Sequence, residues 1–502
     1  MADFNVSRRQ ILKGGAAAMA IGAIGSLGAL QARQARAATA GATRLGPIPG
    51  PYGPLAPVAD QATGLELLQL PPGFSYTSLG WTGDLMDDGQ PVPDRHDGMA
   101  VLQRPRPDGG ADTVIIRNHE RGIGTAIQAP GMYDTARIRD GAAGGGTTNL
   151  TWRDGRLERM EASLGGTLIN CAGGPTPWGT WLSCEEIKTN EVSANGKRHG
   201  YVFEVDADPS KTSGQPIVGM GRFSHEAVAL DPRTGHVYLT EDDRNRAGLY
   251  RYVPDDTSRR NGALAKGGRL QAACVRGRRN VDLTVASMGD EYALEWVDID
   301  DPDLDNLPAP ASFPDIDAGG TLSGPFAQAW SKGALRMSRG EGMWHAGNSI
   351  FIVDTSTGVD GDGRKGHGDG AVWVLDLSSQ TLRALFVSGR QLAANNPDNI
   401  TVSPRGGVVL CEDGGESADQ FGPGARLLGL TGGGETFYLA KNNAELTDTQ
   451  IARAGKQVPE GDYRRGEFCG ACWDPEGRTL FVNIQTPGIT LAITGPWQHG
   501  GL

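Results

Sequence analysis

The residues best suited to chemistry lie in Thr176–Glu186, where a thiol and two carboxylates follow a short apolar run. Cys184 is followed directly by Glu185 and Glu186. Because side chains alternate along a strand, Cys184 and Glu186 are expected on one face and Glu185 on the other. A thiolate suits a redox-capable transition metal, whereas carboxylates suit a hard cation. The stretch indicates either a mixed metal site or a buried cysteine that ends a strand before two solvated acids.

Other apolar runs along the chain also end in acids, and further acids stand in three polar motifs. The predicted metal ligands are Glu120, Cys184, Glu185, Glu186, Glu226, Glu241, Asp242, Glu341, Asp398, Asn399, Glu412 and Asp413. Brought to one place, so many carboxylates would repel one another unless cations neutralised them. That number of oxygen ligands favours Ca²⁺, with a transition metal at Cys184. If the acids are dispersed on loops instead, no site exists.

Arg339 stands two residues before Glu341, beside a predicted ligand. A guanidinium fork in that position could hold a phosphate with two hydrogen bonds, although an ordinary surface arginine is the alternative. We therefore predict Arg339, Cys184 and Glu341 as the catalytic residues. The sequence contains no GxSxG, Walker, HExxH or strand-linked GxGxxG motif, so the mechanisms that depend on them have no support.

The sequence predicts that short strands joined by tight turns position these residues. Gly and Pro are abundant, with 75 and 30 residues, and helical periodicity is weak. Several apolar runs follow Pro- and Gly-containing turns typical of hairpins. The runs that end in polar residues lie at 113–120, 176–186, 236–243, 349–354, 408–413 and 479–485. We predict an all-β fold, a six-bladed β-propeller with inserted loops and short helices covering a central metal site, against the alternative of a β-sandwich or several small β-domains.

The first 38 residues predict an export signal. Ser7–Lys13 carries a twin arginine, and a weakly hydrophobic run to Leu30 precedes a small-residue cleavage site at Ala35-Arg36-Ala37. The run is short for a membrane span. We expect a twin-arginine signal at 1–38, an irregular lead-in at 39–62 and one propeller domain at 63–502 with an insertion around 255–339. The expected location is the periplasm or outside the cell, with no stable membrane anchor.

The net charge and the cysteine content indicate which binding partners and disulfides to expect. The formal net charge of −12 argues against nucleic acid binding. The six cysteines do not form a dense disulfide pattern, and Cys469 and Cys472, at redox-motif spacing, are expected to pack or to form a local disulfide. We expect a monomer whose partners are its substrates and the export machinery.

Several motifs together resemble the PhoX-type alkaline phosphatases. They are NHE at 118–120, GGTTNL at 145–150, TPWGTWLSCEE at 176–186, GRFSHEA at 221–227, TEDD at 240–243, RGEGM at 339–343, PDNI at 397–400, CEDGG at 411–415 and FCGACWDPEG at 468–477. The resemblance covers about residues 45–490. It implies a six-bladed propeller that holds an iron–calcium cluster, Fe³⁺ and Ca²⁺, and cleaves phosphomonoesters after twin-arginine export. It also implies Cys184 as the iron thiolate, Arg339 as the phosphate-binding residue and the acids as metal ligands.

The expected chemistry is metal-assisted release of phosphate from an organic ester, with cations and Arg339 stabilising the phosphate oxygens. Two alternatives remain from the sequence. One is a calcium-dependent propeller hydrolase of another class, a phosphotriesterase or lactonase. The other is a non-enzymatic binding propeller whose calcium is structural. Iron together with calcium would favour the phosphatase.

Overall fold

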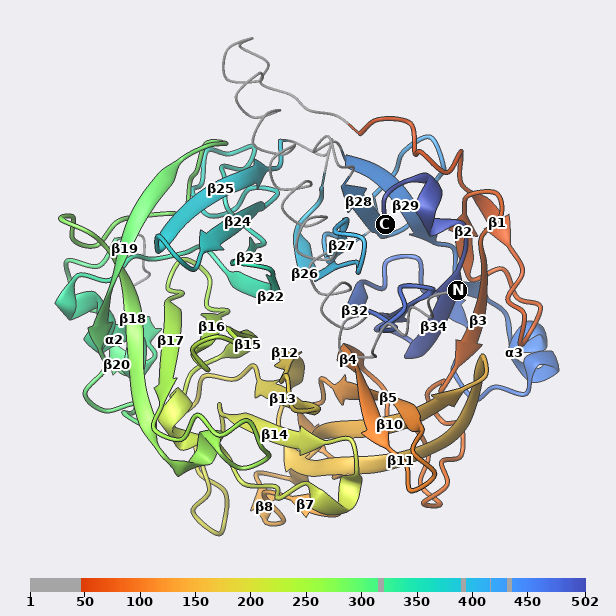
Figure 1. The fold of residues 1–502 in the computed structure, drawn as a ribbon, viewed down its shortest axis with the longest axis horizontal. Coiled ribbons are helices and arrows are strands. Elements are labelled where there is room, and N and C mark those ends of the chain that lie inside the picture. The colour runs from red at the N-terminus through yellow and green to blue at the C-terminus, as the bar shows by residue number, and fades with distance from the viewer. Residues whose placement is uncertain (1–46, 315–319, 390–393, 416, 431–435) are drawn as a thin grey trace, which may run out of the picture.

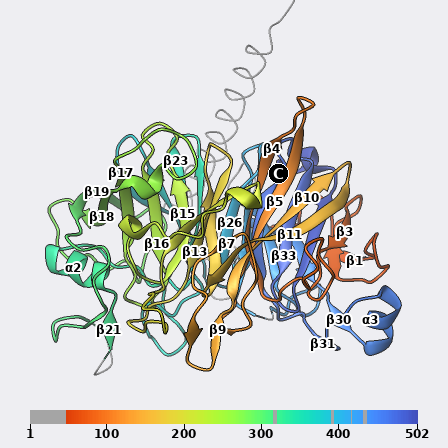
Figure 2. The ribbon, with the colours of Figure 1, turned by 90° about the horizontal axis from the view of Figure 1, so that it is seen from below.

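The computed structural model describes residues 47–314, 320–389, 394–415, 417–430 and 436–502, and most of its regular structure is β-strand. Figures 1 and 2 show the sheets standing around a central axis in a β-propeller-like arrangement, which confirms the all-β prediction. The predicted export signal and the first part of the lead-in lie outside the described residues. In the part of the chain that is described, no helix is both long and apolar enough to cross a membrane.

Five sheets surround the axis. Two belong to the first half of the chain. The first contains β4 (His96–Pro105), β5 (Ala111–His119), β10 (Gly145–Arg153), β11 (Arg156–Thr167) and β7 (Gly131–Met132). The second contains β12 (Asn170–Pro175), β13 (Thr180–Glu185) and β14 (Val202–Asp206). The nine-stranded sheet contains β15 (His225–Leu230), β16 (Val237–Glu241), β17 (Leu249–Pro254), β18 (Gly268–Val275), β19 (Glu291–Asp298), β25 (Thr381–Val387), β24 (Ala371–Asp376), β23 (Ser349–Asp354) and β22 (Gly340–Ala346).

The last two sheets combine both ends of the chain. One contains β26 (Pro397–Val402), β27 (Val408–Glu412), β28 (Arg426–Leu430), β29 (Thr436–Asn442), β2 (Leu68–Leu70) and β1 (Ala56–Val58). The other contains β32 (Phe468–Trp473), β33 (Thr479–Ile484), β34 (Ile489–Thr494) and β3 (Ser75–Leu79). In the second, β3 pairs with β34 from Ser75 opposite Thr494 to Leu79 opposite Thr490. The chain therefore closes on itself by hydrogen bonding its beginning to its end.

The innermost strands form a ring. β4, β12, β15, β22, β26 and β32 each pack against the next, and β32 packs back against β4. Apolar residues cover both faces of the sheets, as the fully buried strand β33 illustrates, and the clusters they form between neighbouring sheets are the hydrophobic core. This packing leaves the axis to the polar residues at the strand ends.

Short elements decorate one edge of the ring, toward the bottom of Figure 2. They include the helices α2 (Gly324–Lys332) and α3 (Asp448–Ala454) and the short strands β6 (Ile123–Gly124), β8 (Arg137–Ile138), β9 (Gly141–Ala143), β20 (Leu307–Pro308), β21 (Thr321–Leu322), β30 (Glu445–Leu446) and β31 (Gly461–Asp462). The segment predicted as an insertion supplies more than a cover, because it contains β18 and β19. β19 pairs with both β18 and β25 and so joins two groups of strands into the nine-stranded sheet.

Candidate metal centre

Every inner strand is interrupted near its first residues. The pairing of each with its neighbour skips two residues, between His96 and Met99, Asn170 and Gly173, His225 and Val228, Gly340 and Met343, Pro397 and Ile400, and Cys469 and Cys472. Such irregularities turn side chains out of the regular alternation and are frequent beside active sites. In five strands the first skipped residue carries an acid or a thiol: Asp97, Cys171, Glu226, Glu341 and Asp398. The ring of irregularities therefore gathers potential ligands around the axis.

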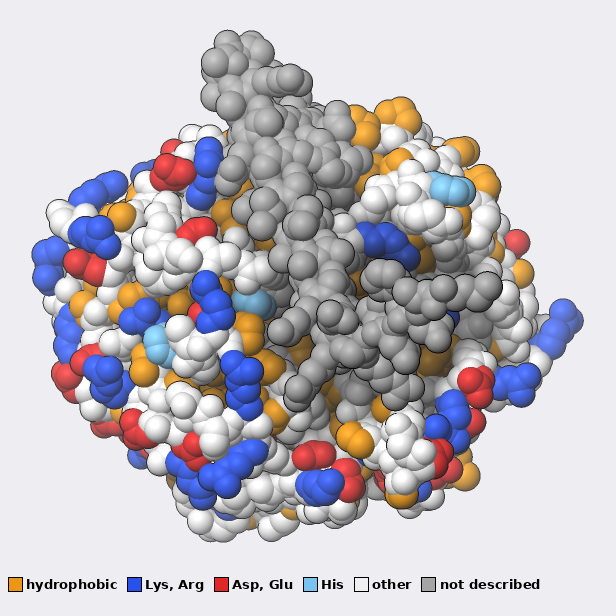
Figure 3. Space-filling view, in the orientation of Figure 1, with side chains coloured by type: hydrophobic (Ala, Val, Ile, Leu, Met, Phe, Trp, Pro, Cys, Tyr) orange, Lys and Arg blue, Asp and Glu red, His pale blue; other side chains and the backbone are white. Residues whose placement is uncertain are grey.

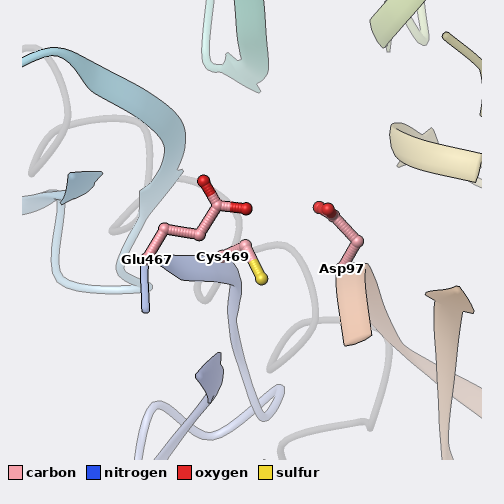
Figure 4. Close-up of side chains that lie close together, drawn as sticks. All are labelled: Asp97, Glu467 and Cys469. Carbon is pink, nitrogen blue, oxygen red and sulfur yellow. The ribbon is translucent and has the colours of Figure 1, made fainter. Parts of the chain in front are cut away.

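The sixth strand places Gly470 at the equivalent position. Its φ of 64° lies in the left-handed region, and a Cβ there would stand 2.5 Å from the backbone oxygen of Asp97. Adjacent inner strands thus approach too closely here for a side chain. The neighbouring residues supply ligands instead. Figure 4 shows Glu467 and Cys469 directed toward Asp97, and their candidate ligand atoms lie within 4.8 Å of one another.

Three further groups of ligand atoms meet the same 4.8 Å limit. They are Cys171 with Glu186 and Glu226, Glu226 with Glu341 and Asp398, and Asp398 with Asp413 and Glu467. Because Glu226, Asp398 and Glu467 each belong to two groups, the four groups join into one continuous cluster. This arrangement offers one thiol on each side of a series of carboxylates.

Glu226 is the clearest sign that the cluster holds something besides protein. Its side chain is fully buried, and within the described parts of the chain neither carboxylate oxygen has a hydrogen-bond partner. A carboxylate in that condition is costly unless it binds a cation or a proton. The acids around it make the cost larger: burial, followed by the charges of Glu341 and Asp398, raises the pKa of Glu226 well above its usual range.

The same cause acts throughout the cluster. Burial raises the pKa of Asp398 to about 7, with the charge of Asp413 adding to it. Burial likewise raises the pKa values of Glu186, Glu341 and Glu467 well above their usual range. Bound cations would reverse these shifts, because they favour the charged carboxylates.

Three of the strands that pair with an inner strand, β13, β16 and β27, end in an acid that is followed directly by another acid. The two members of each pair of acids have different surroundings. In the first pair, Glu185 ends β13 and accepts hydrogen bonds from the backbone amides of Leu168 (2.8 Å), Gly200 (2.7 Å) and Tyr201 (3.1 Å). It also lies 2.6 Å from His199 Nδ1. Glu186, the first residue beyond the strand, lines the central cavity. Glu185 is thus engaged by protein donors, and Glu186 faces the cluster.

The other two pairs repeat this division. Glu241 accepts hydrogen bonds from Tyr250, Ser323 and the amide of Gly248. Glu412 forms a bidentate ion pair with Arg426, at 2.7 and 2.8 Å. The residues that follow them, Asp242 and Asp413, lie beside Arg339 and in the cavity lining respectively. The first acid of each pair therefore has protein hydrogen-bond donors around it, and the assignment of Glu185, Glu241 and Glu412 as metal ligands stays a prediction.

Cys184 is the main difference between the expected and the observed site. Its side chain is fully buried in the apolar cluster that includes Leu182, Val202 and Phe223, and burial alone raises the pKa of its thiol. Strict alternation would place Cys184 with Glu186, but β13 ends at Glu185, so Glu186 no longer follows the strand. Cys171, from the paired strand β12, takes the place beside Glu186. All six cysteines are free and buried, including Cys469 and Cys472.

Arg339 is held rigidly at the cavity. Its Nε donates to Asp242 Oδ1 at 2.7 Å, its Nη2 contacts the other Asp242 oxygen, and Nη2 lies 3.0 Å from Glu341 Oε1. The charge of Glu341 raises the pKa of Arg339 above its usual range. Asp354, at the end of β23, accepts a hydrogen bond from the Arg339 amide at 3.0 Å. Arg339 therefore presents a fixed positive charge among the acids.

The cavity has a volume of about 530 Å³. Predicted residues in its lining are Glu120, Glu186, Arg339, Glu341, Asp398 and Asp413, joined by Arg95, Cys171, Asp462, Tyr463, Arg465, Gly466, Glu467, Gln485 and Thr486. Asn399 lies behind Asp398, donating to it at 2.8 Å while accepting from the amide of Gly470 at 2.7 Å. On the parts of the face in Figure 3 that the grey atoms leave visible, acidic and basic side chains are interspersed. The cavity lining, in contrast, contains more acids than arginines.

Sequence reasoning did not identify Asp97, Cys171, Glu467 and Cys469 as ligands. It followed acids at the ends of apolar runs, whereas these residues lie at or just before the beginnings of inner strands. The available signal was a polar residue beside small ones, as in HDGM at 96–99 and NCAGG at 170–174. Small residues at these places allow the inner strands to approach one another.

Comparison with known proteins identifies the family of the chain and a similar fold. The family model described as alkaline phosphatase PhoX matches residues 50–161 and 154–488. The structure of Pseudomonas fluorescens PhoX in complex with vanadate, a transition state analogue, aligns with a TM-score of 0.61 and 18% identity, covering 91% of this chain and 98% of that one. A Xanthomonas campestris gluconolactonase aligns over 91% of this chain and 99% of its own, with a TM-score of 0.39 and 11% identity, too low to support a conclusion. A search of curated protein sequences finds no match. The family model covers most of the sequence, and the chain therefore belongs to the PhoX family of alkaline phosphatases.

Proposed function

We propose that this chain hydrolyses phosphomonoesters at the central cavity and that a cluster of calcium and iron ions occupies it. The single observation that carries the proposal is Glu226, whose two oxygens are buried without partners between the groups containing Cys171 and Asp398. Family membership supplies the reaction class, phosphoric monoester hydrolysis. The related Pseudomonas fluorescens PhoX binds vanadate, a transition state analogue. A phosphate-shaped ligand therefore fits the architecture.

The donor set suits these ions. Carboxylates are the ligands that Ca²⁺ prefers, and a thiol beside them suits a transition metal such as iron. The residues proposed to hold the ions are Asp97, Glu120, Cys171, Glu186, Glu226, Asp242, Glu341, Asp398, Asp413, Glu467 and Cys469, with Asn399 orienting Asp398. When bound, the cations supply positive charge against the phosphate oxygens.

The chain's own contribution is to orient the phosphate. Arg339 offers a fixed guanidinium whose N–H groups can bind phosphate oxygens, since Asp242 and Glu341 hold it in place. Glu341 thereby links the arginine to the cluster. An arginine positioned before the reaction stabilises the charge that develops on the phosphate as the ester oxygen leaves.

We propose the number of blades, a cover over the site, export and the oligomeric state on further observations. The closed ring of six inner strands supports a six-bladed propeller beginning near residue 63. The end of β31 and the segment after it, with Asp462 and Tyr463 in the cavity lining, support a partial cover over the site. The twin arginine at the start of the sequence supports export in a folded state to the periplasm or beyond. We also propose that the enzyme acts as a monomer.

Elemental analysis with a substrate panel tests the function. We expect calcium and iron in the purified protein, and hydrolysis of monoesters in preference to diesters, triesters and lactones. Chelation should remove the activity and lower the melting temperature together, because the vacated carboxylates repel one another. Calcium without iron, combined with turnover of lactones or triesters, would instead identify another class of propeller hydrolase. Calcium without any turnover would identify a binding propeller.

A further inference from the structure

A second arginine enters the cavity at the side of the ring opposite Arg339. Arg95 precedes β4, just as Arg339 precedes β22, and each stands two residues before the acid at its strand's irregularity, Asp97 and Glu341. In the order in which the inner strands pack around the ring, β4 and β22 are three places apart in either direction. Both arginines line the same cavity. A ligand bound there has a guanidinium on each side.

The two arginines differ in how firmly they are held. Arg339 contacts two carboxylates, and 23% of its side chain is exposed. Within the described residues, Arg95 makes one ion pair, from Nη2 to Glu120 Oε2 at 2.7 Å, and 45% of its side chain is exposed. Its remaining N–H groups can therefore reach a ligand. Because Arg95 is the more exposed, it lies toward the opening, while Arg339 lies among the buried acids.

The backbone at Arg95 does not explain why an arginine stands there. Arg95 has a φ of 55°, in the left-handed region, and the equivalent residues before β12 and β26, Ile169 and Asn396, both have a φ of 50°. The left-handed entry is therefore a recurrent feature of the inner strands. Asn is a residue type that this conformation favours, whereas a long side chain such as Arg has no such preference. What sets position 95 apart is the charged group that it delivers into the cavity.

The size of the cavity leaves room for more than a phosphate. About 530 Å³ is in the range of sites that enclose a small organic molecule. A phosphate placed among the buried acids and Arg339 leaves the rest of the ester pointing toward the opening. There it meets Arg95 and Arg465, which also lines the cavity. Positive charge at this level matches a substrate that carries a second negative group.

We propose that Arg95 binds a second anionic group of the substrate, so that the enzyme favours phosphomonoesters that also carry a carboxylate or another phosphate. The proposal rests on the proposed phosphatase function and specifies the substrate class of that site. Arg95 is a substrate-binding residue in this role. It acts on the distal part of the molecule, so its removal raises KM most for esters that carry the second anionic group.

The test compares two esters of nearly the same skeleton, 3-phosphoglycerate with a carboxylate and glycerol 3-phosphate with a hydroxymethyl group. The variant is Arg95→Gly, because Gly adopts a φ of 55° without strain and the fold is retained. Arg139→Gly is the matched control: Arg139 has a φ of 52°, lies outside the central cavity and forms an ion pair with Glu191. Both variants are purified with their metals and compared with wild type.

We expect wild type to favour 3-phosphoglycerate, and Arg95→Gly to raise KM for that ester by about tenfold or more, the effect of losing a hydrogen bond to a charged group. KM for glycerol 3-phosphate should change far less, and Arg139→Gly should behave as wild type. An equal loss for both esters would place Arg95 on the phosphate itself and overturn the proposal, as would an unchanged ratio. Calorimetry of the binding of the two esters distinguishes failure of this proposal from failure of the proposed phosphatase function. If 3-phosphoglycerate binds more tightly in an Arg95-dependent way but neither ester is hydrolysed, the phosphatase function is refuted and the anion-binding site is retained. If binding shows no Arg95-dependent preference, the anion-binding site is refuted.

Discussion

The acids that end β13, β16 and β27 and the acids that come one residue later occupy very different environments. Glu185, Glu241 and Glu412 are fully buried and engaged by amides, hydroxyls or an arginine. Of their immediate neighbours, Glu186 and Asp413 line the central cavity, and Asp242 is paired with Arg339, which also lines it. One step along the chain thus separates a carboxylate surrounded by the fold from one at or beside the cavity. The charge is the same, and what differs is the place of the carboxylate relative to the axis.

The same contrast separates the two cysteines on paired strands. Cys171 lies at the irregular start of β12, beside Glu186 and Glu226. Cys184 lies in the regular part of β13 among apolar side chains. A thiol binds a metal as the thiolate, which apolar surroundings disfavour and a nearby metal ion favours. The following experiments test whether function follows this division.

The largest effect is expected at the thiols. Cys171→Ser should remove the transition metal and reduce turnover by orders of magnitude, because a hydroxyl is a poor ligand for it. Cys184→Ser should keep both and lose about 1–3 kcal/mol of stability from burying a hydroxyl. Iron per chain and kcat in the two variants are the measurements. Full iron in Cys171→Ser, with its loss in Cys184→Ser, would reverse the assignment made from the structure.

The adjacent acids should separate activity from stability. Glu186→Gln is expected to lower metal content and turnover by at least tenfold while the metal-free fold becomes more stable, since a repelling charge is removed. Glu185→Gln should lower the free energy of unfolding by about 2–4 kcal/mol, because an amide cannot accept all the hydrogen bonds that this carboxylate receives. Denaturation curves and metal analysis of both variants check the pair. Equal losses of stability would show that the two acids share one role.

Removing the metals should make stability depend on pH. Burial raises the pKa of Asp398 to about 7 from an ordinary 3.8, so the folded protein keeps a proton that the unfolded chain has released. The free energy of unfolding should therefore fall as pH rises from about 4 through 7, by up to roughly 4 kcal/mol from this group alone. Chemical denaturation of the chelated protein at pH 5 and pH 8 measures it. Added calcium should abolish the decrease, and a chelated protein that gains stability at pH 8 would contradict the cluster.

The smallest effect is expected where the inner strands touch. A Cβ at Gly342 would stand 2.7 Å from the backbone oxygen of Asp398, so Gly342→Ala should cost about 1–3 kcal/mol and disturb the neighbouring acids. Gly361→Ala is the control, because no atom lies within 4 Å of its added Cβ. Melting temperature and metal affinity of the two variants are compared. A Gly342→Ala protein as stable as the control would show that the ring tolerates expansion.

The sequence was informative about strands and less so about which side chains face the axis. Apolar runs and their turns predicted the all-β fold, and the motifs around Glu226, Glu341 and Asp398 pointed to residues that the structure brings together. Strict alternation could not predict which of Glu185 and Glu186 faces the axis, because that depends on where β13 ends. Asp97 and Cys171 were missed for a related reason. Irregular pairing at the start of an inner strand breaks the alternation from which the direction of a side chain is predicted, and its local sign here is the small residues beside Asp97 and Cys171.

The pairing of β3 with β34 has a consequence for the order in which the enzyme is made. Asp97 and Glu120 leave the ribosome long before Glu467 and Cys469, yet all four belong to the site. Until β32 is synthesised, Asp97 lacks Glu467 and Cys469, the two residues with which it is grouped, and the ring is not closed by the pairing of β3 with β34. Contacts between such distant segments form slowly. At the proposed site, the complete set of ligands would therefore exist only after the ring has closed.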